Sequence, residues 1–104
     1  MLNDLEMMSP TMIVAAMGFA ALTEDGLADL ADVSPVDVHN VCVSKPERAP
    51  GRELLLQLTH ALNEIGLVRV RRQHDGAAVG WRSYVVQQRW LCRLEKLPLA
   101  HRTR

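Results

Sequence analysis

The pattern of hydrophobic and polar positions along the chain predicts five helices and one β-hairpin. Apolar residues recur every three or four positions over residues 10–22, 24–32, 35–43, 53–65 and 87–97, as they do on one face of a helix. Between the last two stretches the period changes to two. In the segment LVRVRR, Val68 and Val70 alternate with Arg69 and Arg71, which predicts a strand whose valines face the core. Residues 79–86 alternate as well and predict the return strand.

Local start and stop signals support these boundaries. Ser9, Thr23 and Ser34 precede helical stretches, and each is a residue type whose side chain accepts a hydrogen bond from a free amide of the first turn. Gly66 is the expected left-handed end of the fourth helix. Asp75 and Gly76 predict the hairpin turn, with Gly80 giving the loop freedom. The length of 104 residues indicates one domain, with residues 1–8 and 98–104 expected to be flexible.

Two of the predicted helices carry faces that could contact a partner. In the first helix Ile13, Val14, Met17, Ala20 and Ala21 form a broad apolar stripe. Its glycine, Gly18, and its alanines predict close packing by a neighbour and could seat a second subunit. The fourth helix gathers its core side chains within one third of its circumference: Leu54, Leu55, Leu58, Ala61, Leu62 and Ile65. Its opposite face displays Leu56, Gln57, His60, Asn63 and Glu64.

The net charge of zero conceals a division between the two parts of the chain. Residues 1–44 contain seven acidic residues and no Lys or Arg, whereas residues 45–104 contain all 12 basic residues and five acidic ones. Such an uneven field could orient the molecule on a polyanion. The alternative is that the two halves pack together and neutralise each other.

The sequence gives little support for catalysis or for binding of a metal or cofactor. No nucleophile elbow, glycine-rich phosphate loop or metal-ligand spacing is present, so we expect neither an enzyme nor a cofactor. Cys42 and Cys92 lie far apart in apolar surroundings and are expected to be buried, reduced thiols, although one disulfide stays open. The apolar run 11–22 is shorter than a membrane span requires and does not resemble a secretory signal, which favours the cytoplasm.

Two segments resemble known DNA-binding families. The passage LADLADVSPVDVHNVCV, residues 27–43, resembles a bacterial helix-turn-helix, and that resemblance implies that Val36, Asp37, His39 and Asn40 face DNA. The phrase ALNEIGLVRVRR resembles the end of the recognition helix and the start of the wing in winged-helix regulators of the bacterial and phage type. The implied fold is α+β, mainly helical and winged helix-turn-helix-like, with four to five helices and a hairpin wing in the C-terminal half. Either helix 35–43 or helix 53–65 could be the reading helix. Helix 53–65 is favoured because it lies next to the wing.

Three functions remain open from the sequence. The first is a DNA-binding transcriptional regulator, with contacts to double-stranded DNA expected from eight residues: Arg52, Gln57, His60, Asn63, Arg69, Arg71, Arg72 and Arg82. The second is a small interaction protein of phage or mobile-element type, which uses a winged-helix scaffold to bind a host protein or protein–nucleic-acid complex. Its expected contacts are Leu56, Trp90 and Leu94. The third is a subunit whose first and last helices build an oligomer, such as a homodimer.

Overall fold

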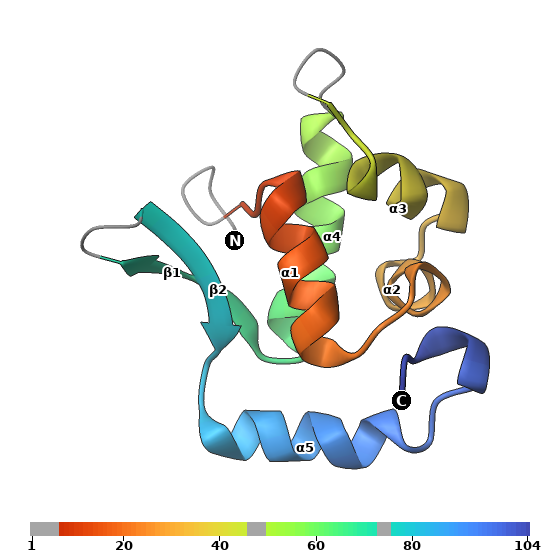
Figure 1. Ribbon diagram of the computed structural model, residues 1–104, viewed down its shortest axis with the longest axis vertical. Coiled ribbons are helices and arrows are strands. Elements are labelled where there is room, and N and C mark those ends of the chain that lie inside the picture. The colour runs from red at the N-terminus through yellow and green to blue at the C-terminus, as the bar shows by residue number, and fades with distance from the viewer. Residues whose placement is uncertain (1–6, 46–49, 73–75) are drawn as a thin grey trace.

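Five α-helices and one two-stranded antiparallel sheet form the described part of the chain (Figure 1). The structure is a computed structural model that describes residues 7–45, 50–72 and 76–104, and of residues 71, 72, 76 and 77 only the backbone. The elements follow in the order α1 (Pro10–Ala20), α2 (Glu24–Ala31), α3 (Pro35–Cys42), α4 (Arg52–Glu64), β1 (Leu67–Arg72), β2 (Gly76–Trp81), α5 (Tyr84–Leu94) and a short 3₁₀ turn, η2 (Leu99–His101). The predicted α+β, mainly helical fold with a hairpin in the C-terminal half is confirmed.

Three of the predicted helix starts are confirmed by their capping hydrogen bonds. Ser9 Oγ accepts a hydrogen bond from the Met12 amide at 3.3 Å, and Thr23 Oγ1 accepts one from the Gly26 amide at 3.1 Å. Ser34 Oγ does the same for the amide of Asp37 at 3.1 Å. Each bond satisfies a donor that the helix itself leaves unpaired, which is why these boundaries could be read from local sequence.

The core lies where α1 and α2 cross α4 and the hairpin. Ile13, Leu27, Leu58, Leu62 and Leu67 are fully buried there. In Figure 1, α1 lies in front of α4, with α2 and α3 on one side, the hairpin on the other and α5 beneath. The predicted apolar face of α4 is confirmed as part of this core. No helix in the described ranges is both long and apolar enough to cross a membrane.

The prediction for α1 is only partly correct. Met17 and Ala20 are buried as expected, but Val14 is 46% exposed. Gly18 also faces solvent, and a Cβ placed on it would meet nothing within 4 Å. Neighbours thus bury Ala16 and Ala20 of α1, whereas no atom of the described residues packs against Gly18.

The predicted orientation of the first strand is wrong. Val70 is exposed and Val68 only partly buried, whereas Leu67 is fully buried. The strands pair with Leu67 opposite Trp81, Arg69 opposite Val79 and Val68 opposite Gly80. Since Leu67 enters the core and side chains alternate along a strand, Arg69 shares the inward side and the valines turn outward. Gly80 belongs to this ladder and not to the loop, and the predicted turn at Asp75 lies outside the described residues.

The return strand is shorter than predicted because a helix begins earlier. β2 ends at Trp81, and α5 starts at Tyr84 in place of the predicted residue 87. Ser83 caps this helix, since its Oγ accepts a hydrogen bond from the Val86 amide at 3.2 Å. The alternation that predicted a strand through Val86 is thus overridden by a capping serine, a residue type that favours helix starts over strand interiors.

The inner face of α5 completes the core. Trp90 and Leu94 are 2% and 3% exposed, and Trp90 Nε1 donates to the Ala20 carbonyl oxygen at 2.8 Å. Both side chains thus belong to the core of this chain, and their predicted role as partner contacts finds no exposed surface at these two positions. Leu56, the third residue of that set, is partly buried on α4.

The C-terminal tail is attached to the α1–α2 connection, contrary to the expected flexible end. Leu22 and Arg102 form an isolated β-bridge, and the Thr103 amide donates to the Ala21 carbonyl at 2.8 Å. The Thr23 amide donates in turn to the His101 carbonyl at 3.2 Å. At the other end of the chain, Met8 is fully buried, so the expected loose segment 1–8 does not reach that far.

Candidate nucleic-acid interface

The outward face of α4 presents polar side chains on a rigid helix. Gln57 and His60 are exposed, and Asn63 is partly buried near the end of the helix. Leu55, Leu58 and other core residues anchor the opposite face. The amide and imidazole groups are of the kinds that hydrogen-bond to base edges in a major groove, and α4 is an element of the size that such a groove admits.

One member of this face is held by an acidic neighbour. His60 Nε2 lies 3.0 Å from Glu64 Oε1, and both side chains are 66% exposed. The pair is one helical turn apart, a spacing at which side chains meet on a helix surface. Glu64 therefore fixes the ring of His60 while placing a negative charge on the same surface.

Three of the predicted contact residues meet at the C-terminal end of α4. Arg82 Nη2 donates to the Asn63 carbonyl oxygen at 2.8 Å, and the Arg82 amide donates to the Gly66 carbonyl at 2.7 Å. Asn63, Arg69 and Arg82, together with Val68, line one surface hollow of about 210 Å³. The Asn63 carbonyl also accepts a hydrogen bond from the Gly66 amide at 3.0 Å, so the guanidinium is a further donor to this carbonyl at the negative end of the helix.

Arg69 contributes to this hollow from the inward side of β1. Its Nη1 donates to the Met7 carbonyl oxygen at 3.1 Å, and the side chain is partly buried. Arg69 thus joins the start of the described chain to the hairpin as well as adding charge beside Asn63. A role limited to phosphate contact, as the sequence suggested, would be incomplete for this residue.

Helix α5 extends the positive surface with two arginines that sequence reasoning missed. Arg89 and Arg93 line a second hollow of about 220 Å³, which shares Arg82 with the first. Arg93 also lies over the Trp90 ring, with its guanidinium carbon 5.6 Å from the ring centre. We define the arginine strip as Arg69, Arg82, Arg89 and Arg93. The spacing of 89 and 93, four residues apart in a predicted helix, was the available signal.

The remaining predicted contacts lie apart from the strip or outside the described side chains. Arg52 is exposed at the first position of α4, about 16 Å along the helix axis from Asn63. Arg71 and Arg72 belong to β1, but their side chains are not described. Among the predicted contacts whose side chains are described, Asn63, Arg69 and Arg82 share one hollow.

The helix-turn-helix segment presents a different surface. Val36, Asp37, His39 and Asn40 are exposed on α3, as the resemblance implied. His39 Nδ1, however, lies 3.1 Å from Glu24 Oε1 on α2, and α3 itself carries no Lys or Arg. Phosphates would meet carboxylates here, so α4 is the better candidate for a reading helix.

The acidic helices lie away from the hairpin. In Figure 1, α2 and α3 occupy one side of the molecule and β1 and β2 the other, with α1 and α4 between them. The tail is the exception, since it packs on α2 and brings His101 Nδ1 to 4.0 Å from Asp29 Oδ2. The acidic residues of α2 and α3 therefore lie on the side of the molecule away from the hairpin, and the tail brings His101 close to one acidic residue of α2.

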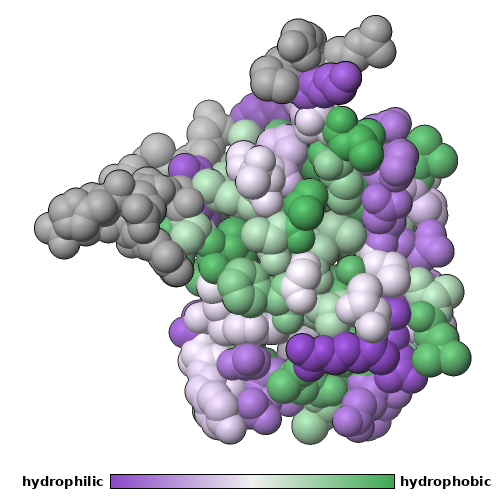
Figure 2. Space-filling model, viewed as in Figure 1, coloured by the Kyte–Doolittle hydropathy of each residue, from purple (hydrophilic) through white to green (hydrophobic). Residues whose placement is uncertain are grey.

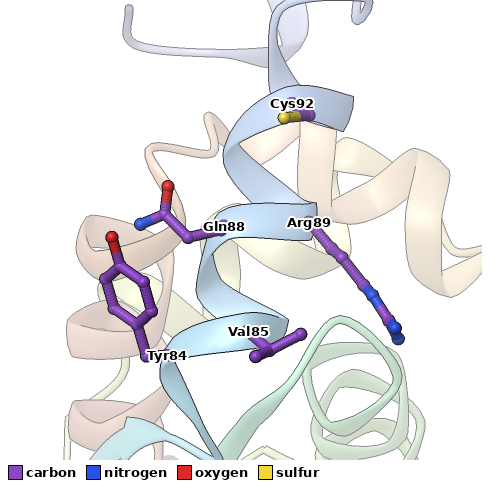
Figure 3. A pocket seen from close by; sticks show the side chains of 5 residues that line it. All are labelled: Tyr84, Val85, Gln88, Arg89 and Cys92. Atoms are coloured by element: carbon purple, nitrogen blue, oxygen red, sulfur yellow. The ribbon is translucent and has the colours of Figure 1, made fainter.

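The outward face of α5 contains a second kind of surface (Figure 3). Tyr84, Val85, Gln88, Arg89 and Cys92 line an open hollow whose walls are mostly apolar. Tyr84 and Val85 are 73% and 57% exposed, which is high for side chains of their size.

The two cysteines differ in their surroundings. Cys92 is exposed on α5, so the expectation that both thiols are buried is wrong. Cys42 is partly buried, and its thiol lies 3.8 Å from Met17 Sδ. Burial, assisted by the nearby Glu24 carboxylate, raises the pKa of the Cys42 thiol. Both cysteines are free.

Comparison of the chain with protein-family models, with curated proteins and with solved structures gave no match. In the described ranges, no group of three or more His, Cys, Asp or Glu side chains is arranged to hold a metal ion.

Proposed function

We propose that this chain is a DNA-binding transcriptional regulator of winged-helix type that acts in the cytoplasm. In this proposal α4 enters the major groove of double-stranded DNA, and the arginine strip contacts the flanking phosphates. The supporting observation is that two hollows at the end of α4 share Arg82, with Asn63 of α4 lining one of them and Arg89 of α5 lining the other. Side chains that could read bases thus lie beside side chains that neutralise phosphates, which is the division of labour in DNA recognition.

The order of elements also supports the proposal. The polar face of α4 leads through Gly66 directly into β1, as a reading helix leads into its wing. Glu53 and Glu64 on α4 oppose it, because carboxylates repel phosphates. We therefore expect moderate affinity, with most of the binding free energy supplied by the arginines and reduced by salt.

A mobility-shift titration with mixed-sequence duplex DNA at low and moderate salt tests this proposal. The test variant combines Arg89→Gln with Arg93→Gln, both exposed on α5. The control combines Lys45→Gln with Arg104→Gln, which removes the same charge from exposed positions outside the strip. We expect the test variant to bind at least about tenfold more weakly than the control, since two phosphate contacts are lost. Equal binding by the two variants would contradict the assignment of the strip.

The alternative is an interaction protein, of phage or mobile-element type, that docks on a host protein or protein–nucleic-acid complex. The observation that favours it is the exposed apolar surface of Tyr84 and Val85 on α5 (Figure 3). Under this alternative, the wild-type chain fails to shift DNA even at low salt. Tyr84→Asp would then abolish capture of the partner, and Arg89→Gln with Arg93→Gln would matter less.

A further inference from the structure

We infer that α1 is the contact surface between two copies of this chain. Five residues of α1 face solvent at the spacing of a single helical stripe: Thr11, Val14, Ala15, Gly18 and Phe19. Phe19 is 51% exposed and Val14 46%. The opposite side of the same helix is buried in the core, so α1 is apolar on both sides. A helix that is hydrophobic all round is normally covered all round.

The stripe is free of charge along its whole length. Residues 9–23 contain no Asp, Glu, Lys or Arg. In Figure 2, hydrophobic and near-neutral residues gather over the position of α1, and hydrophilic residues lie to the right of them and below them. An uncharged apolar surface with a polar rim is the pattern of a protein contact, and it offers no charge that would direct a differently charged partner.

The sequence of the stripe is complementary to itself when the second helix runs antiparallel. A two-fold axis passing between positions 16 and 17 places Val14 opposite the partner's Phe19, and Ala15 opposite the partner's Gly18. Each pair occurs twice, as a two-fold interface requires. The large side chains then meet at the two ends, and the small residues meet at the centre.

The small central residues allow the two helices to approach closely. A Cβ on Gly18 would meet no atom of the described residues within 4 Å, so among these residues the space above the glycine is open. Phe19 of each copy can therefore lie along the partner's helix toward Val14. A second copy of the chain matches both the shape of the stripe and its absence of charge. This inference does not depend on the proposed DNA binding.

The test uses two charged variants that are informative when mixed. Val14→Lys and Phe19→Glu each place a charge opposite an apolar side chain at both ends of the interface. In a mixture of the two variants, the introduced lysine faces the introduced glutamate at one end, and the native Val14 and Phe19 meet at the other. Val36→Lys on α3 is the control, because that valine is 66% exposed and lies outside the stripe.

Sedimentation equilibrium at tens of micromolar gives the outcome. We expect wild type and Val36→Lys to show twice the chain mass of 11.6 kDa, and each stripe variant alone to show the single mass. Each stripe substitution is expected to raise the dimer dissociation constant at least about tenfold, and mixing the two variants is expected to restore the dimer. A monomeric wild type would overturn the inference and leave the stripe to a different partner. The pairing of Val14 with the partner's Phe19 would be overturned if Val14→Lys alone and Phe19→Glu alone both stay dimeric. It would also be overturned if the mixture of the two variants stays monomeric. Circular dichroism confirms that the variants are folded.

Discussion

Gly66 joins the end of α4 to the hairpin, and replacing it tests how the structure holds α5 beside α4. Its φ is +108°, a conformation that side chains with a Cβ rarely adopt. A Cβ at this position would lie 1.8 Å from Val86 Cγ1 and 3.1 Å from Val86 Cβ. Rotating the valine relieves the first overlap but not the second, so α5 itself must shift.

The expected cost of Gly66→Ala is the sum of two effects. The backbone conformation contributes about 1–2 kcal/mol, and inserting a methyl group into an occupied site contributes about 1–3 kcal/mol. We therefore expect the free energy of unfolding to fall by about 2–5 kcal/mol, a large part of the stability of a small domain.

Urea unfolding followed by circular dichroism measures this loss, and a double-mutant cycle separates its parts. Val86→Ala removes the overlapping methyl groups but keeps Cβ, so Gly66→Ala should cost less in that background, by at most about 3 kcal/mol. Gly80→Ala is the matched control, because its Cβ would meet nothing within 4 Å. The reasoning is refuted if Gly66→Ala costs no more than Gly80→Ala, or if the cycle shows no coupling with Val86.

Three further predictions follow from particular contacts. Thr59 is fully buried, and its Oγ1 accepts a hydrogen bond from the Met8 amide at 3.0 Å, so Thr59→Val should lower the free energy of unfolding by about 1–3 kcal/mol. Urea unfolding checks this value against Thr59→Ser, which keeps the hydroxyl group. Cys92 should react with iodoacetamide before Cys42 at neutral pH, because Cys92 is exposed and because burial raises the pKa of the Cys42 thiol. Mass spectrometry of the labelled peptides gives the order of labelling, and labelling of Cys42 first would contradict this prediction. Glu64→Gln should tighten DNA binding about two- to fivefold in a mobility-shift titration, since a negative charge beside the arginine strip is removed, and weaker binding would contradict the placement of α4.

Local signals made the helical part of the fold predictable. Ser9, Thr23 and Ser34 act on amides three residues away, so each cap is decided within one turn of the chain. The left-handed conformation at Gly66 was also predictable, because few other residues tolerate it.

The sequence-based predictions were wrong where contacts between distant parts of the chain determine the structure. Both sides of β1 contain apolar residues, and only the burial of Leu67 settles which side enters the core. Residues 81–86 alternate as a strand does, yet Ser83 starts a helix that packs Trp90 against α1. The attachment of the tail through Arg102 depends on backbone hydrogen bonds to the α1–α2 connection, which no sequence pattern announces.

The sequence also predicted part of the candidate interface. Asn63 and Arg82 were singled out by type and by the helix–hairpin order, although their contact across 19 residues was not foreseen. Arg89 was not predicted, because the apolar pattern of the last helix identifies its buried face and gives no information about its exposed residues. An early start of α5 at Tyr84 brings that arginine into line with Arg82.

The dependence of DNA affinity on salt tests the central claim most directly. Fluorescence anisotropy with a labelled duplex gives the slope of log Kobs against log salt for wild type and for the Arg89→Gln, Arg93→Gln variant. If both arginines contact phosphates, the slope of the variant should be shallower by about 2, while Lys45→Gln with Arg104→Gln leaves it unchanged. A wild-type chain that does not bind, or identical slopes for wild type and the arginine variant, would contradict the account.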